Sequence, residues 1–207
     1  MSEQYDEDYF MRGRESGKSL YENYRWMPTL TIPMVQRIID HLGIDRDETI
    51  LDLGCARGYI VKAFRQLGYL AYGMDCSKWA IDNADEEVKE HLRHQDKFTH
   101  EFDWVLAKDV LEHVPQVADF VLEIQKHARK GIFVVVPLSA IDGKSYVLPE
   151  YEKDVTHIHR LTLATWARMF IRPGWEVTAS YRVKGIKDNH NLPGWEPGDG
   201  FIVCRRQ

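Results

Sequence analysis

The clearest indication of the fold is the stretch Ile50-Leu51-Asp52-Leu53-Gly54-Cys55-Ala56-Arg57-Gly58-Tyr59. A run of apolar residues ends here in a glycine turn and leads into helical spacing, which is the pattern of a buried strand followed by a helix. Glycine has no Cβ, so backbone N–H groups in such a turn can approach a ligand closely. Ala56 stands where a middle glycine often lies, and a strand-to-helix turn without a ligand is the alternative.

A second strand-like run follows roughly twenty residues downstream and ends in an acid. Leu70-Ala71-Tyr72-Gly73-Met74-Asp75 places the Asp75 carboxylate at the end of a strand. In a βαβ nucleotide site, a carboxylate at this spacing accepts hydrogen bonds from ribose hydroxyls. The alternative is an ordinary helix N-cap, because Asp75-Cys76-Ser77 precedes a helical run. Together the two stretches favour a nucleoside-containing cofactor.

The composition is that of an ordinary globular protein and excludes several function classes. The 207 residues suit one α/β domain over 1–207, and no linker divides them. A net charge of −5 without a long Lys/Arg run argues against bulk nucleic-acid binding. The three cysteines lack a disulfide spacing, which favours reduced thiols and a cytoplasmic protein. The acidic N-terminal residues and the lack of a long apolar run predict neither a signal peptide nor a membrane span.

Residues 1–31 form a distinct N-terminal leader that is rich in tyrosine and other aromatic residues. Such a segment is too aromatic for a disordered tail. We expect Ser19–Trp26 to form a short helix that packs on the body of the protein. This helix would act as a lid over a site, or simply as a hydrophobic terminal helix.

Strand and helix patterns alternate along the rest of the chain. Helices are predicted at Pro33–His41, Tyr59–Leu67, Trp79–His91, Pro115–Arg129 and Thr162–Ile171. Strands are predicted at Thr49–Leu53, Leu70–Met74, His94–Asp96, Phe102–Ala107 and Gly131–Val136, with a terminal antiparallel pair at Trp175–Val183 and Gly200–Arg205. Asn189–Trp195, between the last two, reads as a hairpin connection or a substrate-side loop. The alternation predicts an α/β fold with a doubly wound, mostly parallel sheet.

Three stretches in this order resemble class I S-adenosylmethionine-dependent methyltransferases. They are the glycine turn at 51–58, Gly73-Met74-Asp75, and Phe102-Asp103-Trp104-Val105-Leu106-Ala107-Lys108-Asp109-Val110-Leu111-Glu112-His113-Val114. The Leu-Glu-His-Val after the fourth strand is similar to that of many small-molecule methyltransferases. The resemblance implies a Rossmann-like, seven-stranded sheet with an antiparallel last strand, and a site at the carboxyl ends of the strands.

The resemblance also implies the cofactor S-adenosyl-L-methionine, with S-adenosyl-L-homocysteine as its product. By this likeness Asp75 would hold the ribose hydroxyls, and Asp96 or Gln95 would reach the adenine amino group. The residues expected to contact the methionine part, or to line that end of the site, are Gly54, Cys55, Gly58, Lys108 and Asp109. Asp52 and Cys76 complete the expected cofactor-binding set, with Cys76 beside the adenine.

Methyl transfer from a sulfonium is an in-line displacement, and a hydroxyl or amine acceptor must also lose a proton. The candidates for a catalytic base are His113, His157 and His159. Each has a structural alternative, as a packed turn residue or as part of a polar loop. His157 and His159 are alternate residues of an extended segment near Asp154, which also suggests metal ligands. Without a cysteine pair or a helical His-x-x-x-His, the sequence favours no metal.

These observations predict a methyltransferase that acts on a small or medium polar acceptor, such as a hydroxyl or amine of a sugar or metabolite. One alternative is a catalytically inactive module that keeps the fold and the cofactor. Another is a nicotinamide-dependent dehydrogenase, but the turn lacks the Gly-x-Gly-x-x-Gly spacing of that class. No residue pattern indicates a particular oligomeric state.

Overall fold

The computed structural model describes residues 2–188 and 197–207 and holds one seven-stranded sheet within them. The strands are β1 (Thr49–Leu53), β2 (Leu70–Asp75), β3 (Leu92–His94), β4 (Phe102–Lys108), β5 (Ala128–Pro137), β6 (Trp175–Ser180) and β7 (Asp199–Arg206). Their order is β3-β2-β1-β4-β5-β7-β6, and β7 is antiparallel to both neighbours while the other pairs are parallel. The predicted sheet is confirmed, and the Asn189–Trp195 loop lies outside the described residues.

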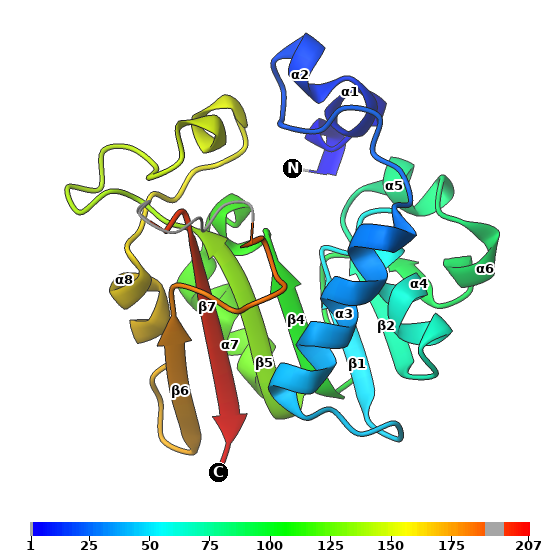
Figure 1. Ribbon diagram of the computed structural model, residues 1–207, viewed down its shortest axis with the longest axis vertical. Helices are drawn as coiled ribbons and strands as arrows, with labels where there is room; N and C mark the ends of the chain where they lie inside the picture. The colour runs from blue at the N-terminus through cyan, green and yellow to red at the C-terminus, as the bar shows by residue number, and fades with distance from the viewer. Residues whose placement is uncertain (1, 189–196) are drawn as a thin grey trace.

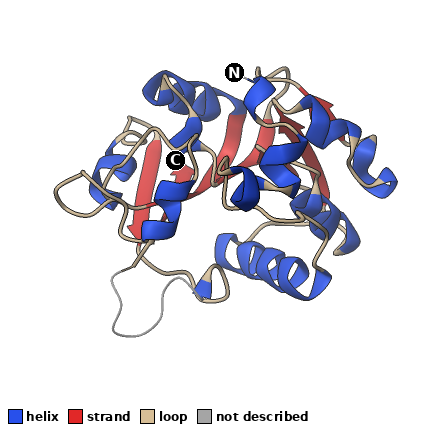
Figure 2. Ribbon diagram, turned by 90° about the horizontal axis from the view of Figure 1, so that it is seen from above, coloured by secondary structure: helices blue, strands red, loops and turns tan. Residues whose placement is uncertain are grey.

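Helices cover both faces of this sheet (Figures 1 and 2). They are α1 (Glu7–Met11), α2 (Gly13–Ser16), α3 (Pro28–Leu42), α4 (Tyr59–Gln66), α5 (Lys78–Asp82), α6 (Glu86–Lys89), α7 (Val117–His127) and α8 (Leu163–Arg168), with short 3₁₀ turns at Ser2–Gln4, Leu111–His113 and Pro149–Lys153. None of the described helices combines the length and the apolar character that crossing a bilayer requires.

Two apolar cores lie on the opposite faces of the sheet. One contains α3 and α4 residues and the other contains α7 and α8 residues. Successive side chains of a strand point to opposite faces, so Phe133 and Val135 of β5 join the first core while Ile132 and Val134 join the second. Because both faces are covered, the carboxyl edge of the parallel strands is where a ligand can enter.

The structure differs from the sequence-based expectation in the segment 79–94. One helix was expected at Trp79–His91, but the chain forms the two short helices α5 and α6. The Asn83 side chain donates to the Trp79 carbonyl (2.9 Å) where α5 ends, and Asp85 precedes α6 and pairs with Lys62 (2.7 Å). The following strand is Leu92–His94 rather than His94–Asp96.

The N-terminal part of the chain also differs from the expectation. Ser19–Trp26 is not helical, whereas α1 and α2 lie earlier in the leader. Asp6 starts α1 because its carboxylate accepts from the Tyr9 amide (3.0 Å). The long helix α3 begins at Pro28 rather than Pro33, since proline at the first helical position lacks only an amide that would be unpaired anyway.

The leader lies beyond the carboxyl ends of the parallel strands (Figure 1). Contacts on two sides hold it there. The Ser77 hydroxyl, at the start of α5, donates to the Tyr5 carbonyl (2.5 Å), and the Tyr9 hydroxyl donates to Asp154 (2.9 Å), far along the chain. The Phe10 ring stacks on Trp79 with a centroid distance of 5.5 Å. The leader therefore bridges two edges of the same opening.

Candidate active site

A cavity of about 430 Å³ lies under the leader at the carboxyl edge of the sheet. Its volume falls within the range of small-molecule sites. The leader contributes Gln4, Tyr5, Tyr9, Phe10 and Tyr21. The ends of β1, β2 and β3 contribute Leu53, Gly54, Ala56, Met74, Asp75, Cys76, Gln95 and Asp96. The segment after β4 contributes Asp109, Val110, His113, Val114, Pro115, Gln116 and Phe120.

The turn after β1 is held by hydrogen bonds to the end of β2. The amides of Gly54 and Cys55 donate to the Met74 carbonyl (2.8 and 3.1 Å), and the Ala56 amide donates to Asp75 (2.7 Å). Gly54 has a φ of 72°, and a Cβ there would lie 2.5 Å from Val110. Glycine is needed at position 54 for its backbone conformation and for its close packing against Val110. The amides of residues 54–56 donate to acceptors at the end of β2 rather than to a ligand.

Asp75 presents its carboxylate to the cavity. One oxygen accepts from the Ala56 amide and the other from the Ser77 amide, both at 2.7 Å. The N-cap of α5 is Ser77, so the capping alternative for Asp75 does not apply. Burial raises the pKa of Asp75, and its two backbone hydrogen bonds oppose this shift. Each oxygen keeps acceptor capacity for a ligand hydroxyl.

Asp109, just after β4, is another of the acids on the cavity wall. Burial alone would raise its pKa, but the charges of Lys108 and Lys187 outweigh that effect and hold it below its ordinary value. Both ammonium groups lie 2.5 Å from its oxygens. Lys187 also contacts Asp199 (2.8 Å). The ion pairs of Asp109 therefore stabilise this side of the cavity, and Lys108 contacts Asp109 from outside the cavity lining.

Of the three histidines expected near the site, His113 lines the cavity and the other two lie behind it. The ring of His157 packs 4.8 Å from that of His113, and its Nδ1 donates to the Tyr151 carbonyl (2.9 Å). His159 turns away and donates from Nε2 to the Val114 carbonyl (2.7 Å). His157 and His159 therefore do not converge, although they are alternate residues.

A chain of hydrogen bonds orients the His113 ring. The Thr156 hydroxyl donates to Asp154 (2.5 Å), which also accepts from the Tyr9 hydroxyl. The Thr156 oxygen therefore accepts the Nδ1 proton of His113 (2.8 Å), and Nε2 of His113 carries a lone pair. Burial and the neighbouring His157 lower the pKa of His113 to about 4.

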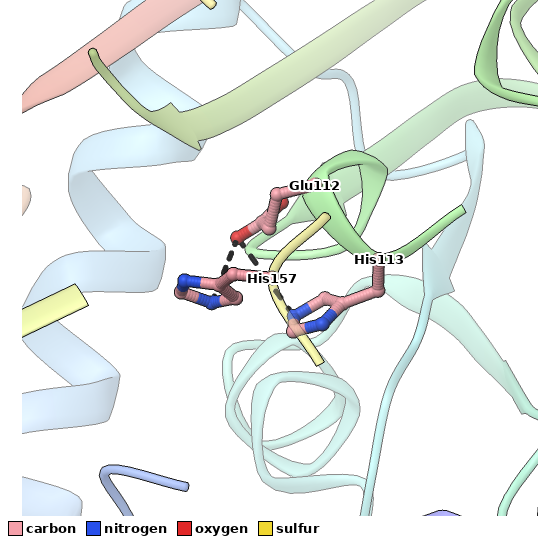
Figure 3. A group of neighbouring side chains, drawn as sticks. All are labelled: Glu112, His113 and His157. Carbon is pink, nitrogen blue, oxygen red and sulfur yellow. Dashed lines mark ion pairs between the residues drawn. The ribbon is translucent and has the colours of Figure 1, made fainter. Parts of the chain in front are cut away.

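Glu112 lies against both rings (Figure 3). Its side chain is 1 % exposed, and Oε1 is 3.9 Å from Nε2 of His113 and 4.0 Å from Nε2 of His157. Burial raises the pKa of Glu112 well above its ordinary value, and the Asp109 charge adds to this shift. One carboxyl group and two imidazoles thus form a cluster next to the cavity, and His113 is its member that lines the cavity.

Comparison with known proteins decides the class of this site. Residues 25–180 match the family described as a methyltransferase domain. The chain belongs to this methyltransferase family. With its doubly wound sheet and antiparallel last strand, it is a class I S-adenosylmethionine-dependent methyltransferase, as the resemblance implied. The nicotinamide-dependent alternative is therefore wrong.

Curated relatives of the methyltransferase carry the name ubiquinone biosynthesis O-methyltransferase. The protein from Maricaulis maris is 26 % identical over 168 residues, which cover 68 % of this chain and 65 % of the relative. The protein from Pelagibacter ubique is 29 % identical over 117 residues, covering 48 % of this chain and 49 % of the relative. The chain thus matches between about half and two thirds of the length of these relatives.

Solved structures share the fold of the methyltransferase. Magnesium protoporphyrin IX methyltransferase from Synechocystis, solved with bound SAM, has a TM-score of 0.59 at 16 % identity, covering 85 % of this chain and 79 % of that chain. A SAM-dependent methyltransferase from Archaeoglobus fulgidus has a TM-score of 0.65 at 17 % identity, covering 87 % and 95 %. A complex of a methyltransferase with the Haloferax volcanii Trm112 activator gives 0.65 at 16 % identity, covering 94 % of each chain.

The structure brings only part of the expected site together in the methyltransferase cavity. The expected residues that line it are Gly54, Asp75, Cys76, Asp96, Asp109 and His113. Those that lie outside the lining are Asp52, Cys55, Gly58, Lys108, His157 and His159. Gly58 and Cys55 pack beneath the turn, because a Cβ on Gly58 would meet Leu92 at 2.6 Å and the Cys55 thiol lies against Gly73.

Asp52 lies within the sheet, behind the glycine turn. Its side chain is buried, and its Oδ2 has no hydrogen-bond partner among the described residues. Burial raises the pKa of Asp52 to about 8. Burial thus favours the neutral form of the carboxyl group, which suits a packing role beneath the turn.

Several residues of the site were not among the expected ones. Glu112 belongs to the Leu-Glu-His-Val stretch, but nothing in the sequence distinguishes a buried glutamate from an exposed one. Lys187 lies in a polar connection 78 residues after Asp109, its ion-pair partner. For the cavity residues of the leader, the sequence did contain a signal, because its aromatic composition predicts packing on the body of the protein. The leader residues that line the cavity include Tyr5, Tyr9, Phe10 and Tyr21.

Proposed function

We propose that the methyltransferase transfers the methyl group of S-adenosylmethionine to a hydroxyl of a small acceptor that enters beside His113. The observation that carries this proposal is the position of His113 on the cavity wall, with Nδ1 hydrogen-bonded to Thr156 so that Nε2 is left to accept a proton. A hydroxyl acceptor must lose its proton during transfer, and the free Nε2 of a neutral imidazole in this position can accept that proton.

The residues of the cavity fit the cofactor. The Asp75 carboxylate has remaining acceptor capacity for ribose hydroxyls, and Gln95 and Asp96 offer polar atoms at the neighbouring strand end. Bound S-adenosylmethionine supplies an already activated methyl group. The protein then has to align the acceptor with it and keep water out, and the leader covers the cavity in a way that serves both needs.

The choice of oxygen as acceptor atom is supported by the relatives, whose names specify O-methyltransferases. These relatives match this chain over only part of their length, so their substrate is not carried over. A small acceptor fits the cavity, which holds about 430 Å³ in total. The amine acceptors that the sequence also allows are tested against hydroxyl acceptors, such as sugars, in the experiment below.

The test is a calorimetric titration with S-adenosylmethionine, S-adenosylhomocysteine and NAD, followed by methyl-label transfer to matched hydroxyl and amine acceptors. We expect micromolar binding of the two sulfur compounds, no binding of NAD, and transfer to hydroxyls. His113→Gln should lower the rate of transfer and leave cofactor affinity close to that of the wild type. Cofactor binding without transfer to any acceptor would favour the inactive module instead.

A further inference from the structure

The Glu112 carboxyl group is buried without a hydrogen-bond partner among the described residues. Both Oε1 and Oε2 lack a donor within reach. Burying a carboxylate in this way is costly unless the group is protonated or lies next to positive charge. Among the described residues, the ion-pair contacts of Glu112 are with the two imidazole rings, at 3.9 Å for His113 and 4.0 Å for His157.

Both rings turn an unprotonated nitrogen toward Glu112. A carbonyl can only accept, so the hydrogen bond from His157 to the Tyr151 carbonyl places the His157 proton on Nδ1. His113 keeps its proton on Nδ1 as well, through Thr156. Nε2 of each ring therefore carries a lone pair, and the two nitrogens lie 3.9 and 4.0 Å from Glu112 Oε1 (Figure 3).

We propose that Glu112, His113 and His157 bind a divalent transition-metal cation. Two imidazole nitrogens and one carboxylate oxygen are ligands that zinc and related ions prefer. The three donor atoms lie within 4.8 Å of one another. Ligand atoms around tetrahedral zinc are roughly 3.4 Å apart, given bonds of about 2.1 Å, so binding needs only modest closure of the three side chains.

The hydrogen bonds around the cluster match those of histidines that ligate metals. Such histidines usually donate their other N–H to a carbonyl or, directly or through another group, to a carboxylate. His157 donates to the Tyr151 carbonyl, and His113 donates to Thr156, which is bound to Asp154. Both rings are therefore held in the orientation that binding requires before a cation arrives.

One coordination position of the cation would face the cavity, because His113 lines it. An acceptor hydroxyl that coordinates there would lose its proton to water more easily, since the cation lowers the pKa of the hydroxyl. His113 would then act as a ligand rather than as the base. This use of the cation rests on the proposed hydroxyl acceptor, whereas binding of the cation does not.

The experiment measures cation binding first, without any acceptor. Chelator-treated protein is titrated with Zn²⁺ by calorimetry, and with Co²⁺ by absorption spectroscopy. We expect one Zn²⁺ per chain and a Co²⁺ spectrum without a thiolate charge-transfer band, which excludes the cysteines as ligands. Glu112→Gln and His157→Gln should each weaken Zn²⁺ binding by about tenfold or more. The matched control is His159→Gln, from the same segment, which should keep the zinc affinity of the wild type.

S-adenosylhomocysteine affinity of each variant reports whether the fold and the cofactor site are intact. Substoichiometric Zn²⁺ binding to the wild type, or unchanged zinc affinity in both ligand variants, would overturn the proposal. Loss of methyl transfer on chelation, restored by Zn²⁺, would extend support to the role in deprotonation. Methyl transfer that persists in fully metal-free protein would overturn that role while leaving the proposed function standing.

Discussion

At the scale of single residues, Asp75 connects the glycine turn to the cavity. Its oxygens accept from the Ala56 and Ser77 amides and still face the ligand space. We predict that Asp75→Ala weakens S-adenosylhomocysteine binding by about tenfold or more, because the ribose hydroxyls lose a charged acceptor. Calorimetric titration measures this change. Asp82→Ala, an exposed acid in the helix that follows, should bind like the wild type, and equal affinities in both variants would contradict the ribose role.

Much of this residue-scale arrangement could be predicted from the sequence, but not the parts made by distant contacts. The glycine turn and Asp75 follow two consecutive strands, and the number of residues between them is enough to predict that they lie close together. Ala56 adopts a φ of 47°, a left-handed conformation that no local pattern indicates, since non-glycine residues rarely adopt it. The cluster of Glu112 with His157 depends on a segment 45 residues away along the chain, which no local pattern reports.

At the scale of elements, the ion-paired side chain of Asp103 connects the amino ends of β1, β4 and β5. Asp103 of β4 accepts from the amide and hydroxyl of Thr49 at the start of β1, and it pairs with Arg129 of β5 at 3.0 Å. The hydrogen bond from Arg129 lowers the pKa of Asp103 to about 2. An acid with a lowered pKa in the folded protein adds stability above its unfolded pKa.

We therefore predict that the stability contributed by Asp103 is fully present above pH 4 and is lost as the pH falls toward 2. The unfolded chain binds the proton first in this window, so acidification favours unfolding. Urea unfolding of the wild type and of Asp103→Asn should differ at pH 7, and the difference should shrink below pH 4. Asp142→Asn, on an exposed loop, serves as the control. A difference that is constant with pH would exclude this ion pair as its source.

The leader is the element whose position bears most directly on catalysis. It supplies one wall of the cavity and is tied to both sides of the opening through Ser77 and Asp154. We predict that deleting residues 1–26 lowers both cofactor affinity and turnover, because the cavity loses this wall. The deletion also removes the packing of Phe10 on Trp79 and of Trp26 on the first core, so the midpoint of thermal unfolding should fall, and affinity and rate are therefore compared well below that midpoint. A truncated enzyme with wild-type affinity and rate would show that the leader does not act as a lid.

The predicted starts of two strands, β1 and β4, are confirmed, whereas β5 begins at Ala128 rather than at the predicted Gly131. β1 and β4 begin at the predicted residues because their strands are buried on both faces. The largest errors fall at the leader and at 79–94, where short helices are fixed by capping contacts such as Asn83 with Trp79 and Asp6 with Tyr9. Periodicity over a long window cannot report contacts of this kind.

At the scale of the whole molecule, both apolar cores share a single sheet. Each interior strand of the sheet contributes side chains to both cores. Unfolding of one core would therefore disrupt the strands that also form the other core. We predict one cooperative unfolding transition, with equal calorimetric and van't Hoff enthalpies, and a higher midpoint with S-adenosylhomocysteine. Differential scanning calorimetry tests this. Two resolved transitions would instead indicate independent units within 1–207.

The antiparallel strand β7 also affects how the protein is made. It pairs with β5 on one side and β6 on the other, yet it follows both in the chain. During synthesis β5, with its apolar run Ile132–Val136, emerges before the strand that covers its edge. An uncovered apolar edge can pair with another chain. The nascent protein is therefore most open to aggregation between the emergence of β5 and that of β7, and chaperone demand should be highest in that interval.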